Sequence, residues 1–147
     1  MNFEVTVVVE IPHGSMYKYE IDKKTSQLVV DRPLERPLPY NYGYVPQTLH
    51  EDGDPLDICI ISKYPIFPLT KVRVVLLGAW LCQDNGCSDH KLVGQVVGED
   101  YHRKEERISG VKNYLQTYKE GFTVDKWVDA PEAYEILMKD LQAYQNT

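Results

Sequence analysis

Residues 51–60 read EDGDPLDICI, a stretch that joins an acidic turn to an apolar run continuing to Ile61. Asp-Gly and Asp-Pro are turn dipeptides, and the apolar run has the composition of a buried strand. A loop entering a sheet explains both features without any ligand. Asp57, however, is predicted at the mouth of the strand, where a carboxylate is costly unless a cation pairs with it. We therefore expect Asp52, Asp54 and Asp57 to converge on a cation.

The rest of the chain predicts strands first and helices afterwards. Alternating or β-branched segments predict strands over 3–11, 16–22, 28–31, 72–81 and 91–97, with an Asn85-Gly86 hairpin signal before the last. After residue 100 the C-terminal third is predicted to be helical. One helix covers 108–118 with Gly121 as its cap, and a second begins near Pro131. Short strands followed by helices indicate an α+β domain built on a barrel or a strongly bent sheet.

Composition limits the class of protein. With 147 residues, 43% of them hydrophobic, the chain suits one compact domain over 1–147. The net charge of -6 disfavours non-specific nucleic-acid binding, which needs a basic face. No apolar run is long enough to span a membrane, and the N-terminal residues lack the pattern of a signal peptide. Three cysteines without metal-finger spacing indicate reduced thiols, so we expect a cytoplasmic protein.

The histidines and a group of tyrosines are also to be considered as candidate ligand-binding residues. The histidines show no metal-pair spacing and are predicted to be surface residues: His13, His50, His90 and His102. Tyr40, Tyr42 and Tyr44 could form an aromatic strip that stacks bases, a reading that the negative net charge disfavours.

Ionisable residues at strand ends and in loops predict a site for a metal and a phosphate. The acids are Glu10, Glu20, Asp52, Asp54, Asp57, Asp84 and Asp89, and the bases are Lys18, Arg32, Lys91, Lys119 and Lys126. Carboxylates with few histidines favour hard cations such as Mg²⁺ or Mn²⁺ over Zn²⁺, and interspersed Arg and Lys suit phosphate oxygens. Simpler explanations stay open at this point. Asp84 and Asp89 could be ordinary hairpin-loop residues, and Lys18 with Glu20 a solvated ion-pair face.

Asp52-Gly53-Asp54-Pro55-Leu56-Asp57 resembles the signature of the soluble, Mg²⁺-dependent family I inorganic pyrophosphatases. Further segments match that family in order and near its spacings: 9–12, 18–22, 30–32, 41–44, 84 with 89–92, 118–119 and 126–128. The resemblance covers about residues 3–140. It implies a small OB-like β-barrel flanked by C-terminal helices.

The resemblance also assigns roles to residues. It gives the metal-ligand role to Asp52, Asp57 and Asp89, which Asp84 joins. It makes Asp54 the general base that takes a proton from the attacking water. The implied phosphate-holding set is Lys18, Arg32, Tyr42, Tyr118 and Lys119. Glu10, Glu20 and Lys91 would support the ligands and the metal-bound waters.

The implied activity is hydrolysis of pyrophosphate to two orthophosphates by metal-activated water, with several Mg²⁺ ions that Mn²⁺ or Zn²⁺ could replace. Two alternatives stay open: an OB-like binding module with reduced catalysis, and a Mg²⁺-dependent hydrolase of polyphosphate or a nucleotide. The family resemblance implies a homo-oligomer, whether hexamer, trimer or dimer. Segment 98–113 is shorter than in typical bacterial members, which puts the hexamer in doubt. Leu38 replaces the family's usual Tyr, so one hydroxyl near the site is expected to be missing.

Overall fold

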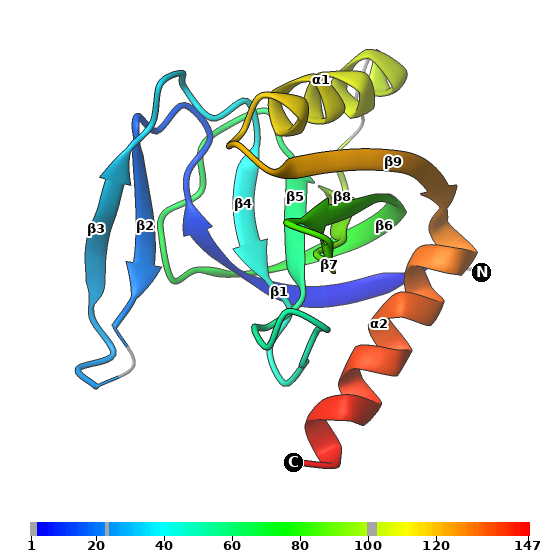
Figure 1. Ribbon diagram of the computed structural model, residues 1–147. Coiled ribbons are helices and arrows are strands. Elements are labelled where there is room, and N and C mark those ends of the chain that lie inside the picture. The colour runs from blue at the N-terminus through cyan, green and yellow to red at the C-terminus, as the bar shows by residue number, and fades with distance from the viewer. Residues whose placement is uncertain (1–2, 23, 100–102) are drawn as a thin grey trace.

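A closed β-barrel forms the centre of the molecule (Figure 1). The computed structural model describes residues 3–22, 24–99 and 103–147. The barrel strands follow one another around the sheet in the order β1 (Glu4–Ile11), β4 (Asn41–Tyr44), β5 (Asp57–Ile61), β8 (Lys91–Val96) and β6 (Lys71–Asp84). Strand β6 pairs back to β1 and closes the barrel. Only β5 and β8 run parallel among these neighbours. The predicted α+β class and OB-like barrel are confirmed.

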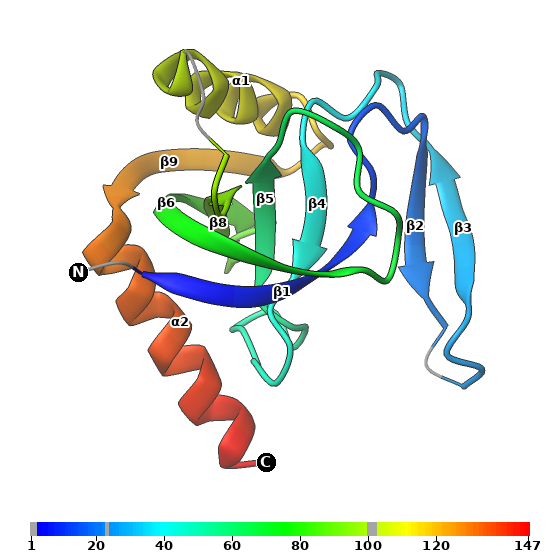
Figure 2. The same ribbon diagram turned by 180° about the vertical axis from the view of Figure 1, so that it is seen from behind.

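The remaining elements surround the barrel. Strands β2 (Tyr17–Ile21) and β3 (Leu28–Pro33) form a separate hairpin, which both Figure 1 and Figure 2 show standing to one side. The short β7 (Cys87–Ser88) and the longer β9 (Phe122–Asp129) pair with β6. Helix α1 (Lys104–Gln116) packs on β9, and α2 (Ala130–Gln145) packs on β6 and β9. Pro131 lies at the start of α2, as its fixed φ favours.

Strand β5 explains why residues 58–61 form a continuous apolar run. Ile58 and Ile60 belong to a core cluster that also includes Leu137 of α2. Cys59 and Ile61 belong to a second cluster that includes Val111 of α1. Because successive side chains of a strand point to opposite faces, a strand between two cores is apolar at every position.

Gly43 is required where β1 and β4 approach each other. A Cβ at this position would lie 2.0 Å from the carbonyl oxygen of Val8, so any side chain would push the two strands apart. This close contact keeps the neighbouring Tyr42 and Tyr44 next to β1 at the mouth of the barrel.

Two predictions for the C-terminal third are wrong. Residues Phe122–Asp129 form a strand, whereas only helices were predicted there. The register of β9 shifts between Leu81 and Cys82 of its partner, so an irregularity near Asp125 interrupts the alternation that would have revealed the strand. Gly121 does not cap α1, because the helix ends at Gln116 and Thr117 is its C-cap. Gly121 instead has a φ of +81° at the entry to β9.

Candidate active site

The carboxylate loop, residues 50–57, is held in shape by its own backbone. The His50 N–H donates to the carbonyl of Asp54 at 2.8 Å, and the Gly53 N–H donates to the carbonyl of His50 at 3.0 Å. Gly53 has a φ of +88°, a conformation that glycine adopts without strain. The Asp54 N–H donates to the Asp52 carboxylate at 3.0 Å, which fixes that side chain relative to the turn. The turn chemistry predicted for this stretch is therefore present.

Strand pairing brings Asp57 beside Lys91. The two residues are partners in the parallel register of β5 and β8. The Lys91 Nζ lies 2.6 Å from Asp57, 2.9 Å from Asp89 and 3.0 Å from the Tyr42 hydroxyl. Three partners match the three donors of an ammonium group. Burial lowers the pKa of Lys91, but Asp57 and Asp89 more than offset this and raise the pKa well above its usual range.

Three carboxylates converge at the barrel mouth. Oxygen atoms of Asp52, Asp57 and Asp89 all lie within 4.8 Å of one another. Burial raises the pKa of Asp52 to about 6, opposed by the Asp54 hydrogen bond and reinforced by Asp89 and Asp57. A pKa raised in this way indicates that a cation would stabilise the ionised cluster. An all-oxygen set of this size fits a hard divalent cation such as Mg²⁺.

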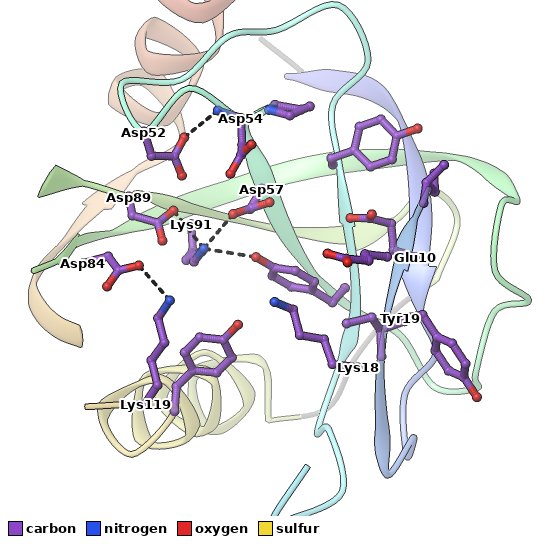
Figure 3. A pocket seen from close by; sticks show the side chains of 17 residues that line it. Glu10, Lys18, Tyr19, Asp52, Asp54, Asp57, Asp84, Asp89, Lys91 and Lys119 are labelled. Carbon is purple, nitrogen blue, oxygen red and sulfur yellow. Dashed lines mark hydrogen bonds and ion pairs between the residues drawn. The ribbon is translucent and has the colours of Figure 1, made fainter. Parts of the chain in front are cut away.

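These side chains line a cavity of about 410 Å³, shown in Figure 3. Acids of the carboxylate loop lie on one side of it, and Lys18 and Lys119 reach in from the opposite side. The lining residues are Glu10, Ile11, Lys18, Tyr19, Glu20, Ile21, Tyr42, Tyr44, Asp52, Asp54, Pro55, Asp57, Asp84, Asp89, Lys91, Tyr118 and Lys119. A cavity with acids facing bases can hold an anion together with metal ions.

Ion pairs orient the basic side of the cavity. Lys119 lies 2.7 Å from Asp84, and Lys18 lies 3.2 Å from Asp31 of the neighbouring strand β3. Burial lowers the pKa of Lys18, but Tyr118 and Asp31 outweigh it, so the net shift is upward. Lys18 therefore remains cationic at neutral pH.

Glu10 lies among the acids with little to neutralise it. Burial is the main cause that raises its pKa to about 7, and the charge of Asp57 adds to the effect, while Lys18 opposes it. Metal-free protein thus contains a carboxyl group that titrates near neutral pH.

The predicted site residues gather around one cavity, except for two basic residues, Arg32 and Lys126. Arg32 does not line the cavity, but its guanidinium carbon lies 5.6 Å from the ring centroid of Tyr118, which does. Asp84 lines the cavity but is paired with Lys119 and is not one of the three converging carboxylates. Lys126, on β9, is not a lining residue.

Sequence reasoning missed several residues of this region. Tyr19 and Ile21 line the cavity although alternation put them on the face opposite Lys18. The prediction that His50 is a surface residue is wrong, since it is 4% exposed and lies 2.6 Å from Asp140 of α2. Leu38 belongs to the apolar core and not to the cavity lining.

The other histidine predictions have mixed outcomes. His13 and His90 are half-buried, so neither is a fully exposed surface residue, and His102 lies outside the described residues.

The three cysteines are free thiols, as expected. Among the residues described, no helix is long and apolar enough to cross a membrane.

The fold and the cavity together define a class: an OB-like barrel whose mouth presents converging carboxylates to an anion site. Comparison with known proteins narrows this class. The family model for inorganic pyrophosphatase matches residues 7–145. The chain therefore belongs to the inorganic pyrophosphatase family.

Individual relatives agree over nearly the whole chain. Soluble inorganic pyrophosphatase 2 of Chlamydomonas reinhardtii is 36% identical over 156 aligned positions, covering 96% of this chain and 81% of the relative. The Campylobacter jejuni inorganic pyrophosphatase is 32% identical, with 97% and 92% covered. The solved inorganic pyrophosphatase of Thermus thermophilus is 31% identical with a TM-score of 0.89, covering 97% of this chain and 91% of that one.

Proposed function

We propose that this protein hydrolyses inorganic pyrophosphate to two orthophosphates. The observation that carries the proposal is the two-sided cavity, in which converging carboxylates face Lys18 and Lys119 (Figure 3). Pyrophosphate is small and highly charged, so its binding needs both metal ions and basic side chains to compensate for its lost hydration. Family membership over residues 7–145 supports the same activity.

Mg²⁺ is the metal that we propose for the site, with several ions per site and with Mn²⁺ or Zn²⁺ as substitutes. Asp52, Asp57 and Asp89 would hold it, because their oxygens already converge within 4.8 Å. Asp84 would join them on the side of Lys119. A bound divalent cation lowers the pKa of its water and neutralises phosphate oxygens.

Asp54 is the proposed general base. Its carboxylate lines the cavity, while its backbone N–H is used in binding Asp52. Because Asp54 is not one of the three converging carboxylates, its side chain is available to take a proton from the attacking water, a task that contributes about 10²–10⁴-fold for a positioned base.

The proposed phosphate-binding residues are Lys18, Arg32, Tyr42, Tyr118 and Lys119. The two lysines point into the cavity. The ring centroid of Tyr118 lies 5.7 Å from the Lys119 Nζ and 5.6 Å from the Arg32 guanidinium carbon. These cations would offset the negative charge that develops on the leaving phosphate, which is the main source of catalysis in phosphoryl transfer.

We propose an indirect role for three further residues, which support the metal ligands but do not contact the substrate: Glu10, Glu20 and Lys91. Lys91 binds Asp57 and Asp89 directly and so fixes their carboxylates. Glu10 and Glu20 line the cavity next to Lys18 and could bind the waters of a hydrated cation.

Orthophosphate release tests the activity. Purified protein in Mg²⁺ alone is assayed with pyrophosphate, tripolyphosphate and a nucleoside triphosphate. We expect release from pyrophosphate to dominate. Equal release from all three would identify a broader phosphoanhydride hydrolase, and no release despite Mg²⁺ binding would identify a binding module.

We further propose a single domain over residues 1–147, a cytoplasmic location, a homo-oligomeric state and no nucleic-acid partner. The net charge of -6 supports the last of these. Light scattering of the purified protein measures the oligomeric state directly.

A further inference from the structure

His50 and Asp140 connect the carboxylate loop to helix α2 inside the protein. The His50 Nδ1 lies 2.6 Å from the Asp140 Oδ2, and the two side chains are 3% and 4% exposed. The backbone carbonyl of Asp140 also accepts the Leu49 N–H at 3.0 Å. The helix is therefore attached to the loop by buried polar contacts in addition to its apolar packing.

The second ring nitrogen of His50 fixes the position of the proton. The backbone N–H of His90 donates to His50 Nε2 at 3.0 Å. An N–H group can donate only to a nitrogen that carries no proton, so the proton of the neutral ring is on Nδ1 and points to Asp140. Asp140 thus selects the tautomer and the orientation of the ring, as carboxylates do for histidines that bind metals.

This one side chain spans the two segments that carry the converging carboxylates. His50 opens the carboxylate loop two positions before Asp52, and its backbone binds Gly53 and Asp54. On the other segment, the bound amide of His90 lies between Asp89 and Lys91. The ring therefore bridges segments that are 40 residues apart in sequence.

The His90 side chain attaches the second segment to the barrel. Its Nδ1 accepts the Cys82 N–H from β6 at 3.0 Å, and its ring centroid lies 5.3 Å from that of His50. The contacts therefore run from α2 through both histidines to the barrel wall. Movement of either carboxylate segment would break at least one of these hydrogen bonds.

We propose that His50 is a positioning residue that sets the separation of Asp52 and Asp89, with Asp140 as its anchor. The proposal rests on the proposed function, because it assumes that these carboxylates hold a divalent cation. Mg²⁺ requires nearly ideal octahedral geometry with bonds of about 2.0–2.1 Å, so a small change in this separation weakens binding.

Two substitutions at His50 test the hydrogen bonds of its two ring nitrogens separately. His50→Asn can still reach Asp140 from the position of Nδ1 but cannot reach the His90 amide. His50→Gln carries its carbonyl oxygen near the position of Nε2 and can accept that amide. We expect His50→Asn to bind Mg²⁺ about 10-fold more weakly or worse, as is typical for residues that support metal ligands. His50→Gln should retain most of the affinity.

Binding is measured by calorimetry with Mg²⁺ in the absence of substrate. The buffer is at pH 8.5 to favour the neutral ring, because Asp140 raises the pKa of His50 against the effect of burial. In turnover assays, His50→Asn should need more Mg²⁺ for half-maximal rate, with kcat at saturating Mg²⁺ close to that of the wild type.

Leu137→Ala is the matched control for stability. Leu137 is a core residue of α2 with 2% exposure, so its truncation lowers the melting temperature without touching His50. This variant should bind Mg²⁺ like the wild type. If His50→Asn also melts earlier but binds Mg²⁺ normally, His50 has only a structural role and the proposal is overturned.

Asp140→Asn provides a second test of the proposal if His50→Asn does not fold. It keeps the shape of the anchor but removes its charge, so the ring is held less firmly. Mg²⁺ binding should weaken in the same direction by a smaller factor, and unchanged binding contradicts the proposal. Wild-type protein that binds Mg²⁺ but releases no orthophosphate would refute the proposed function while leaving the calorimetric result for His50 intact.

Discussion

Lys91 and Asp57 lie side by side in the only parallel strand pair of the described barrel, with 2.6 Å between ammonium and carboxylate. The same ammonium binds Asp89, so one buried cation joins two proposed metal ligands. In metal-free protein this cation is a direct source of neutralising charge for the cluster. Its contribution to stability should therefore depend on whether a metal is bound.

Lys91→Met tests this dependence. Removing one partner of a buried pair leaves Asp57 and Asp89 without their cation, and we expect the free energy of unfolding in chelator to fall by about 3–5 kcal/mol. Excess Mg²⁺ should recover part of this loss, because a ligand that binds only the folded state stabilises it. Urea unfolding with and without metal provides the measurement. Lys71→Met, at an exposed position on β6, is the control and should change little in either condition.

Metal removal should abolish activity reversibly. With an all-carboxylate ligand set, we expect no orthophosphate release in excess chelator and full recovery on adding Mg²⁺. Mn²⁺ or Zn²⁺ should support turnover with broader substrate choice, because they tolerate other geometries. Undiminished turnover in excess chelator would rule out the metal-dependent mechanism.

Glu10 gives the metal-free protein a specific pH dependence. Its pKa rises from 4.5 to about 7 on folding, mainly through burial, so between these values the folded state holds a proton that the unfolded state has released. Stability therefore falls as pH rises through this window. Glu10→Gln should remove the effect and stabilise the protein at pH 8 in chelator by at most about 3 kcal/mol, with no gain at pH 4.

Urea unfolding at several pH values measures this difference. Glu35→Gln, at an exposed position outside the cavity, is the matched control. Parallel stability curves for the wild type and Glu10→Gln would mean that Glu10 is not buried as the structure has it.

Arg32→Lys should reduce activity although the charge is kept. Arg32 lies over the Tyr118 ring, and a guanidinium can stack there and still bind phosphate with two N–H groups. A lysine ammonium offers neither planar stacking nor a two-pronged contact, so we expect KM for pyrophosphate to rise about 10-fold or more. Arg73→Lys, whose exposed side chain pairs with Glu4, should behave like the wild type. Unchanged kinetics in Arg32→Lys would place this residue outside the site.

Local sequence patterns predicted much of the fold. The alternation in 16–22 and 28–31 reports local backbone geometry, and these segments form the β2–β3 hairpin. Residues 51–61 predicted both the turn and the buried strand, because turn dipeptides and apolar runs act over a few residues. Strand β9 escaped detection because its register shift disrupts the two-residue period on which detection depends.

Local sequence patterns did not predict contacts between residues that are far apart in the chain. His50 and Asp140 are 90 residues apart, and nothing near either residue indicates that the other is its partner. The cost of a lone carboxylate predicted that Asp52, Asp54 and Asp57 converge, but Asp89 takes the place of Asp54 in the converging group, as only the family resemblance implied. The pairing of Asp57 with Lys91 depends on the parallel register of β5 and β8. Long-range register is a tertiary property that one sequence does not reveal.

Asp54→Asn should separate the proposed base from the neighbouring metal ligands. Asp52→Asn and Asp57→Asn should raise the Mg²⁺ concentration needed for activity, since their oxygens belong to the converging cluster. Asp54 lines the cavity outside that cluster, so Asp54→Asn should lower kcat at saturating Mg²⁺ by about 10²–10⁴-fold with a smaller loss of metal affinity. Asn keeps the shape but cannot accept a proton at neutral pH, and the residual rate should rise with pH as solvent hydroxide replaces the base. Kinetics against Mg²⁺ and pH, with a melting curve for each variant, give the measurement. If Asp54 only shapes the turn, Asp54→Asn will instead melt earlier and turn over nearly normally per folded molecule.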